Sequence, residues 1–267
     1  MGKIPDFQRK AVYSIYHNVT HIEAPAITGM QNNVLFVENA DGWHVVKFTD
    51  NWQLVQKNRL ASTVYADYGI PCPRLRVGEV DGVCYETYRI IPGITLFEAV
   101  GRGMAPERIR AVYSDVIKYF ARMDNVPLNP VAKCAAASAH QVALYNIRTA
   151  NGALAAALVA PLVYVLNRGA AQDMGIYHFD ITPKNIIVSP DGRFESFVDM
   201  DSVVLCNRNF ALGGLAIKYR RLGFDLNELY DMCEAASGRA VNRTLVSAMA
   251  ELNNVGKYIL WRSAKTK

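Results

Sequence analysis

Residues 177–185 read YHFDITPKN and residues 198–201 read VDMD, and these two segments hold the most informative side chains of the chain. A carboxylate, Asp180, and an amide, Asn185, stand on one polar loop, and a second carboxylate, Asp199, follows shortly afterwards. Oxygen atoms of this kind are the ligands that magnesium prefers. If Asn185 and Asp199 hold such a cation, Asp180 is left to orient an attacking hydroxyl and accept its proton, so the pattern favours phosphoryl transfer.

Two short apolar runs connect this loop to Asp199. Ile186 to Val188 and Phe194 to Val198 flank the turn-forming residues 189–192, which predicts a tight hairpin. The segments before and after it have helical patterns. A small hairpin among helices therefore marks residues 176–202 as the candidate functional region.

The N-terminal third of the chain predicts a sheet with one helix. Four strands are expected, at residues 34–37 and 43–48 and on either side of Asp81-Gly82. Between the two hairpins, residues 52–68 have the apolar spacing of a helix, which Gly69 ends. The expected order is strand, strand, helix, strand, strand, with Lys47 near the end of the second strand.

From Gly93 onward, helical patterns dominate. Helices are expected at residues 95–101, 106–123, 224–236 and 243–260, with two more between 132 and 168. The longest uncharged stretch, residues 152–167, is rich in alanine and broken by Pro161. It is shorter than the roughly 20 strongly apolar residues of a membrane span, so we expect a core helix there and no membrane contact.

Composition excludes several classes of protein. With 267 residues, 51% hydrophobic and 20% charged, the chain can bury a core and is not disordered; its length predicts one two-lobed unit or two domains. The net charge is +5, but no basic and aromatic interleaving or zinc-finger spacing points to nucleic-acid binding. The five cysteines form no C-x-x-C pair and the N-terminus lacks a secretory h-region, so a cytoplasmic protein with reduced thiols is expected.

The pattern H-x-D-x-x-x-x-N, followed by a short hairpin and an aspartate, resembles the catalytic and metal-binding loops of the aminoglycoside phosphotransferase and choline kinase group, small-molecule relatives of the protein kinases. The resemblance implies an α+β, bilobal protein-kinase-like fold. Its N-lobe, a small antiparallel sheet with one helix, is expected over residues 1–91, and a mostly helical C-lobe over residues 92–267.

The resemblance also implies roles for single residues. Asp180 matches the catalytic aspartate, Asn185 and Asp199 match metal ligands, and His178 matches the structural histidine of the motif. Asp201 resembles a second acidic position found in choline-kinase-like members, and its role stays open between metal ligand and hydrogen-bonding residue.

The nucleotide side of the site is implied in the same way. Lys47 matches the nucleotide-binding lysine, Gly29 to Asn33 resembles the phosphate-facing loop, and Arg89 to Ile91 corresponds to the hinge that binds adenine. The expected cofactors are therefore ATP and magnesium. The expected reaction is transfer of the γ-phosphate to a hydroxyl of a small molecule, because Thr182 stands where protein kinases keep a lysine.

The sequence departs from the group in one respect. The group pairs its strand lysine with a glutamate on the following helix, but no glutamate occurs between Glu38 and Glu79, and Asn58 or Gln56 stands in its place. We therefore expect a loosely held Lys47. This departure motivates one alternative, a kinase-like nucleotide-binding protein without phosphotransfer activity. A second alternative, nucleotidyl transfer from the same site, stays open on other grounds.

The charge of the acceptor stays open. Acidic residues in the C-terminal region hold cationic substrates in aminoglycoside-modifying members, and a helix here carries Asp225, Glu228, Asp231 and Glu234 opposite its apolar face. The same residues also fit a solvated helix face. A basic group, Lys218, Arg220 and Arg221, could equally attract an anionic substrate. Neither the acceptor nor the oligomeric state follows from these residues.

Overall fold

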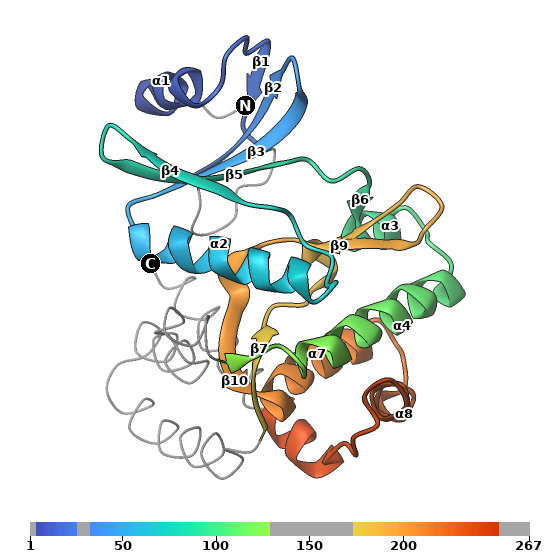
Figure 1. Ribbon diagram of the computed structural model, residues 1–267. Helices are drawn as coiled ribbons and strands as arrows, with labels where there is room; N and C mark the ends of the chain where they lie inside the picture. The colour runs from blue at the N-terminus through green and yellow to red at the C-terminus, as the bar shows by residue number, and fades with distance from the viewer. Residues whose placement is uncertain (1–3, 26–32, 129–172, 251–267) are drawn as a thin grey trace, which may run out of the picture.

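The computed structural model describes residues 4–25, 33–128 and 173–250 and consists of a sheet-rich upper part above a helical lower part (Figure 1). The helices expected between residues 132 and 168, and the end of the helix expected at 243–260, lie outside the described residues. In the described part of the chain, no helix is long and apolar enough to cross a membrane.

A five-stranded antiparallel sheet forms the upper part, in the order β1-β2-β3-β5-β4. Its strands are β1 (His21–Glu23), β2 (Asn33–Asn39), β3 (Gly42–Thr49), β4 (Arg76–Val80) and β5 (Val83–Arg89). Both predicted hairpins are confirmed. At the second turn, Asp81 and Gly82 have φ values of 51° and 76°, the left-handed backbone that an Asp-Gly pair accommodates.

The two faces of this sheet have different neighbours, because side chains alternate along a strand. On β3, Val46 and Phe48 are buried in a cluster with residues of α1 (Asp6–Ile15). Lys47, between them, projects from the opposite face. The predicted helix is confirmed as α2 (Trp52–Asp67), which crosses below the sheet on that face (Figure 1).

The N-terminal end of the expected order was wrong, because α1 and β1 precede the first predicted strand. The start of α1 is a weak signal: its N-cap position is Pro5, which makes no side-chain capping hydrogen bond. The three residues of β1 are too few to show an alternating pattern. Both elements therefore depend on tertiary packing.

A short connection leads into the lower part through β6 (Ile94–Thr95), α3 (Leu96–Gly101) and α4 (Pro106–Met123). The two helices are confirmed, with a capping box between Thr95 and Glu98 at the start of α3. Gly93 has a φ of 135°, and a Cβ there would lie 2.3 Å from the carbonyl oxygen of Val188. Only glycine lets the connection pass this close to the hairpin that follows.

Two small sheets frame the candidate site. The predicted hairpin is confirmed as β8 (Ile186–Val188) and β9 (Phe194–Phe197), which extend β6 into a three-stranded sheet. The strands β7 (Met174–His178) and β10 (Val203–Asn207) pair antiparallel and were not predicted. Their pairing brings the loop after β7 beside the loop before β10.

The described C-terminal part is helical, with α7 (Arg208–Arg221), α8 (Leu226–Ser237) and a further helix over residues 243–250. The predicted apolar face of α8 is confirmed, since Leu229, Tyr230 and Cys233 are buried. Most of α7 is buried, so it lacks the one-sided periodicity that reveals a helix in a sequence.

Candidate active site

The first loop of the site runs from Asp180 to Asn185. The N–H of Thr182 donates to the Asp180 carbonyl at 2.8 Å, and the N–H of Asn185 donates to the Thr182 carbonyl at 2.8 Å, closing the short 3₁₀ turn η2 (Pro183–Asn185). The side-chain amide of Asn185 then donates from Nδ2 to Oδ2 of Asp180 at 3.1 Å. The sequence motif therefore places its carboxylate and its amide in direct contact.

The β8–β9 hairpin returns the chain to this loop. The N–H of Val198 donates to the carbonyl of Asn185 at 3.0 Å, so Asp199 follows directly beside the first loop. Asp199 has φ 68° and ψ 62°, a left-handed conformation that is unusual for a residue with a side chain. It precedes the turn η3 (Met200–Ser202), where the Ser202 N–H donates to the Asp199 carbonyl at 3.1 Å. Strain of this kind is common at functional sites.

Lys47 reaches Asp199 from the sheet above. Its Nζ lies 2.6 Å from Oδ1 of Asp199 and 3.9 Å from Oδ2 of Asp201. Burial opposes the charge of Lys47, but the neighbouring carboxylates, Asp199 first, raise the pKa of Lys47 above its ordinary value. Burial likewise opposes the charge of Asp199, and Lys47 holds the pKa of Asp199 below its ordinary range. The two groups therefore form a charged pair that joins the upper and lower parts.

Glu86 is the residue that sequence reasoning missed. It lies on β5 directly opposite Lys47 in the register, is 3% exposed, and places Oε1 3.5 Å from Nζ of Lys47. The expectation of a loosely held Lys47 was therefore wrong: a strand carboxylate stands beside it although the helix has none. The available signal was a glutamate inside a strand of mostly apolar and aromatic residues, at a position that only the pairing of β3 with β5 places next to Lys47.

Asn58 is one of the two residues expected at the helix position where the resembled group has glutamate. It is fully buried, and its Nδ2 donates to Oε2 of Glu86 at 2.7 Å and to Oδ1 of Asp201. Asp201 is thus engaged in hydrogen bonding, one of the two roles left open for it. Among the residues that the structure describes, Gln56, the other candidate for this position, takes no part in these contacts.

A second buried lysine supports the loop from α2. Lys57 is 8% exposed, and its Nζ donates to the carbonyls of Asp201 at 2.7 Å and Val203 at 3.1 Å. Burial lowers the pKa of Lys57 to about 8. In the sequence Lys57 is indistinguishable from a solvent-facing helix lysine, so no signal could have revealed it. Its contacts fix the backbone that follows Asp199.

His178 has the structural position expected for it. It is 1% exposed, and its Nε2 lies 2.8 Å from the carbonyl oxygen of Val198, the residue before Asp199. Burial lowers the pKa of His178 below its ordinary value, so the neutral ring is favoured. The histidine therefore links the end of β7 to the approach to Asp199.

The expected nucleotide-binding residues are only partly placed. Arg89 is exposed at the end of β5, and Ile91 is half-buried in the connection to the lower part. Between them, the Ile90 N–H donates to the Trp43 carbonyl at 2.8 Å. Gly29 lies outside the described residues, and Asn33 is the first residue of β2.

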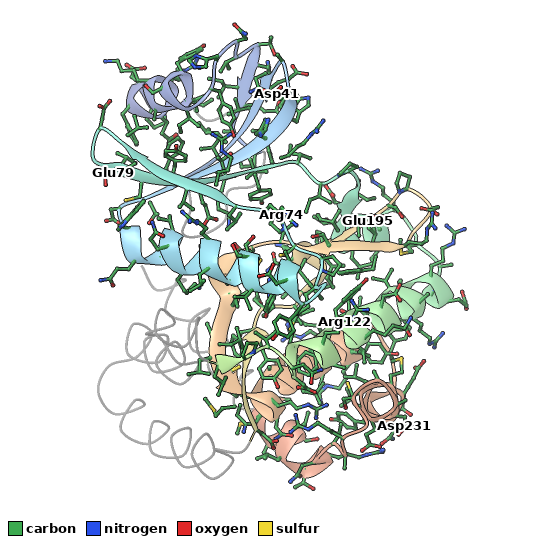
Figure 2. The ribbon with its side chains drawn as sticks, in the orientation of Figure 1. Asp41, Arg74, Glu79, Arg122, Glu195 and Asp231 are labelled. Atoms are coloured by element: carbon green, nitrogen blue, oxygen red, sulfur yellow. The ribbon has the colours of Figure 1, made fainter. Side chains whose placement is uncertain are left out.

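The acidic residues of α8 are engaged by arginines. Arg243 contacts Asp231 at 2.7 Å and Glu234 at 3.6 Å, and Arg110 contacts Glu228 at 3.4 Å. Asp225 caps the N-terminus of α8 by accepting a hydrogen bond from the Asn227 N–H. Figure 2 shows Asp231 at the outer side of α8. These contacts favour the solvated helix face over a site for a cationic substrate.

Among the residues that the structure describes, no three histidine, cysteine, aspartate or glutamate side chains gather as a metal site. Near the junction of the upper and lower parts, the side chains that offer oxygen atoms are instead one amide and several carboxylates. Because Nδ2 of Asn185 donates to Asp180, the carbonyl oxygen of the same amide is left as its acceptor. In Asp199, it is Oδ1 that accepts the hydrogen bond from Lys47.

Comparisons with known proteins identify the fold. No protein-family model matches the sequence, and no curated protein matches it significantly. Among solved structures, the aminoglycoside phosphotransferase APH(3'')-Id from Streptomyces rimosus, in complex with ADP and streptomycin, matches with a TM-score of 0.69 at 15% identity, covering 97% of this chain and 100% of that chain. The choline kinase LicA from Streptococcus pneumoniae matches with a TM-score of 0.63 at 16% identity, covering 97% and 90%.

A third match is the complex of the aminoglycoside phosphotransferase APH(2'')-IIIa with GDP and kanamycin, with a TM-score of 0.68 at 10% identity, covering 97% of this chain and 96% of that chain. All three belong to the group that the H-x-D-x-x-x-x-N motif resembles. The expected α+β, bilobal kinase-like fold is confirmed. The lobe boundary between residues 91 and 92 stays a prediction.

Proposed function

We propose that this protein is an ATP- and magnesium-dependent phosphotransferase that transfers the γ-phosphate to a hydroxyl of a small molecule. The observation that carries the proposal is the contact between Lys47 and Asp199, 152 residues apart in the chain and 2.6 Å apart in space. It brings the lysine that we propose for nucleotide binding to the aspartate that we propose for metal binding. Asp180 and Asn185 stand beside the same loop.

The nucleotide is proposed to lie between the lobes. Lys47 carries the positive charge for its phosphates, and the main chain from Arg89 to Ile91 is proposed to contact adenine. Gly29 and Asn33 are proposed for the phosphate-facing loop. The ADP and GDP bound in two of the matching structures support a nucleotide as the phosphate donor.

The residues present fit magnesium by their chemistry. Asn185 and Asp199 offer an amide oxygen and a carboxylate oxygen, both hard ligands, and magnesium usually completes its shell with water and phosphate oxygens. We propose these two as its ligands, with Asp201 as a third. When bound, the cation neutralises charge on the phosphates. The small number of protein donors agrees with a metal held jointly with nucleotide.

Asp180 is proposed to act on the acceptor. The amide of Asn185 holds Oδ2 of Asp180 and so fixes the carboxylate that is proposed to meet the hydroxyl of the substrate. A carboxylate placed in this way orients the hydroxyl and takes its proton as the bond to phosphorus forms.

The presence of Glu86 weakens the alternative of a nucleotide-binding protein without turnover. That alternative was motivated by the missing helix glutamate, and a carboxylate from β5 stands beside Lys47 instead. Nucleotidyl transfer would use the same groups, and the mass of the product distinguishes it from phosphate transfer.

Mass spectrometry of small hydroxyl compounds, both cationic and anionic, after incubation with ATP and magnesium tests the proposal. The expected result is addition of one phosphate to an acceptor, with matching release of ADP. Addition of a nucleotidyl group would replace phosphotransfer by nucleotidyl transfer. ADP binding without any transfer across the panel would support the non-catalytic alternative.

A further inference from the structure

Lys47 and Glu86 are cross-strand neighbours in the centre of the sheet. The β3–β5 register pairs them directly, so both side chains project from the same face of the sheet. Both are buried, at 9% and 3% exposure, and Nζ lies 3.5 Å from Oε1. The distance between them is therefore set by the hydrogen bonds of one sheet.

This differs from the arrangement in protein kinases, where the strand lysine pairs with a glutamate on the helix and the position of that helix controls the pair. Here the pair does not include α2. The β3–β5 ladder runs from His44 opposite Arg89 to Thr49 opposite Cys84, with the pair inside it. A displacement of α2 leaves both partners on the same ladder.

The amide at Asn58 is complementary to the carboxylate on the strand. Its Nδ2 donates to Glu86 and to Asp201, so one amide group satisfies oxygens of two carboxylates. A glutamate at this position would bring a third negative charge against those two, at a buried place where like charges repel strongly. The loss of the helix glutamate and the presence of Glu86 are therefore two parts of one arrangement.

We infer that Glu86 is the positioning residue for Lys47, in place of the helix glutamate, and that the pair is held by the β3–β5 ladder. The inference rests on the proposed function for its effect on nucleotide binding, whereas the pairing itself is a property of the sheet. Asp199 also contacts Lys47 but is proposed to bind the metal. Glu86 has no such second task, because its other oxygen accepts the hydrogen bond from Asn58.

A double-mutant cycle tests this inference. Lys47→Met, Glu86→Gln and the double variant are compared with the wild-type protein by calorimetric titration with ADP. If Glu86 acts through Lys47, Glu86→Gln weakens ADP binding by about tenfold in the wild-type background, within the range for contacting pairs. In the Lys47→Met background, the same change alters ADP affinity by less than about twofold. Equal losses in both backgrounds, or no loss in either, would overturn the inference.

The same four proteins separate this inference from the proposed function. Should the wild-type protein bind no ADP, the proposed function fails, and urea unfolding of the four proteins then decides the inference without any nucleotide. A paired Lys47 and Glu86 give non-additive losses of unfolding free energy, the double variant losing less than the sum of the single variants. Additive losses would contradict the pairing.

Two further variants guard against a general loss of structure. Glu79→Gln makes the same chemical change at an exposed position of β4, near the outer tip of the β4–β5 hairpin (Figure 2), and is expected to change neither measurement. Should Glu86→Gln not fold, Glu86→Asp replaces it in the cycle with the same criteria.

The exchange variant, Asn58→Glu with Glu86→Gln, moves the carboxylate to the helix at constant charge. It is expected to recover part of the ADP affinity lost in Glu86→Gln, and an affinity below that of Glu86→Gln would argue against an interchangeable role.

Discussion

Asn185 donates a hydrogen bond from Nδ2 to Oδ2 of Asp180 at 3.1 Å, and a second to the carbonyl of the same residue at 2.9 Å. One amide therefore fixes both the side chain and the backbone of the proposed catalytic aspartate. The orientation of Asp180 is set within its own loop, before any substrate binds. This contact connects the proposed metal ligand to the group proposed to act on the acceptor.

Removing the charge of Asp180 should stop turnover and leave the nucleotide in place. For Asp180→Asn, we expect kcat to fall by about 10² to 10⁴, the range for loss of a general base. ADP affinity should stay within about twofold of the wild type, because Asp180 does not act in ground-state nucleotide binding. Steady-state kinetics and calorimetry measure the two quantities. Asp191→Asn, an exposed change in the β8–β9 turn, is the control; unchanged turnover in Asp180→Asn would remove this residue from the proposed role.

Asn185 should control the magnesium requirement. In Asn185→Ala the amide oxygen is lost, and the magnesium concentration for half-maximal activity should rise by about tenfold or more, the usual scale for damage to a metal site. Titration of activity against magnesium at saturating ATP measures it. Asn227→Ala, at an exposed position of α8, should leave the curve unchanged. An identical curve for both variants would contradict metal binding by Asn185.

The lower part contains a buried ion pair that should matter for stability alone. Arg208 and Asp124 are 3% and 5% exposed at their side chains, with Nε 3.0 Å from Oδ2, and Tyr177 also donates to Asp124. Asp124→Asn leaves the buried guanidinium without an opposite charge, which should lower the unfolding free energy by about 3–5 kcal/mol. For the exposed pair of Lys118 and Asp115, Asp115→Asn should cost about 0–1 kcal/mol. Urea unfolding measures the loss of free energy in each variant, and equal losses would contradict the expected effect of burial on the ion pair.

Acidification should destabilise the protein through His44. Burial lowers the pKa of His44 below its ordinary value of 6.5, and among the described residues the buried Nε2 of the ring has no hydrogen-bond partner. Below about pH 6.5 the unfolded chain therefore binds more protons at this residue than the folded chain, so stability falls as the pH falls. In His44→Gln this part of the pH dependence should disappear, while the exposed His17→Gln should keep it. Unfolding free energies between pH 5 and 8 provide the measurement.

The sequence predicted those features that depend on neighbouring residues. The β8–β9 hairpin and α4 follow from turn residues and local periodicity, and the loop holding Asp180 and Asn185 follows from their spacing. The partners of Lys47 could not all be found in this way. Glu86 becomes its neighbour only through the pairing of β3 with β5, which a search limited to the following helix overlooks.

Other elements lack a local signal altogether. Lys57 faces three backbone carbonyls in the folded protein but is one more polar residue in a helical pattern. The strands β7 and β10 are short, and each is stabilised by pairing with the other across a long separation in the chain. Such contacts depend on the assembled fold, so periodicity and capping signals cannot reveal them.

A crystal structure with magnesium and a non-hydrolysable ATP analogue tests the central claim most directly. The account predicts phosphate oxygens within hydrogen-bonding distance of Nζ of Lys47, and a cation coordinated by Asn185 and Asp199. It also predicts an open approach from Asp180 to the terminal phosphate. A nucleotide bound elsewhere, or a cation that contacts neither residue, would contradict it.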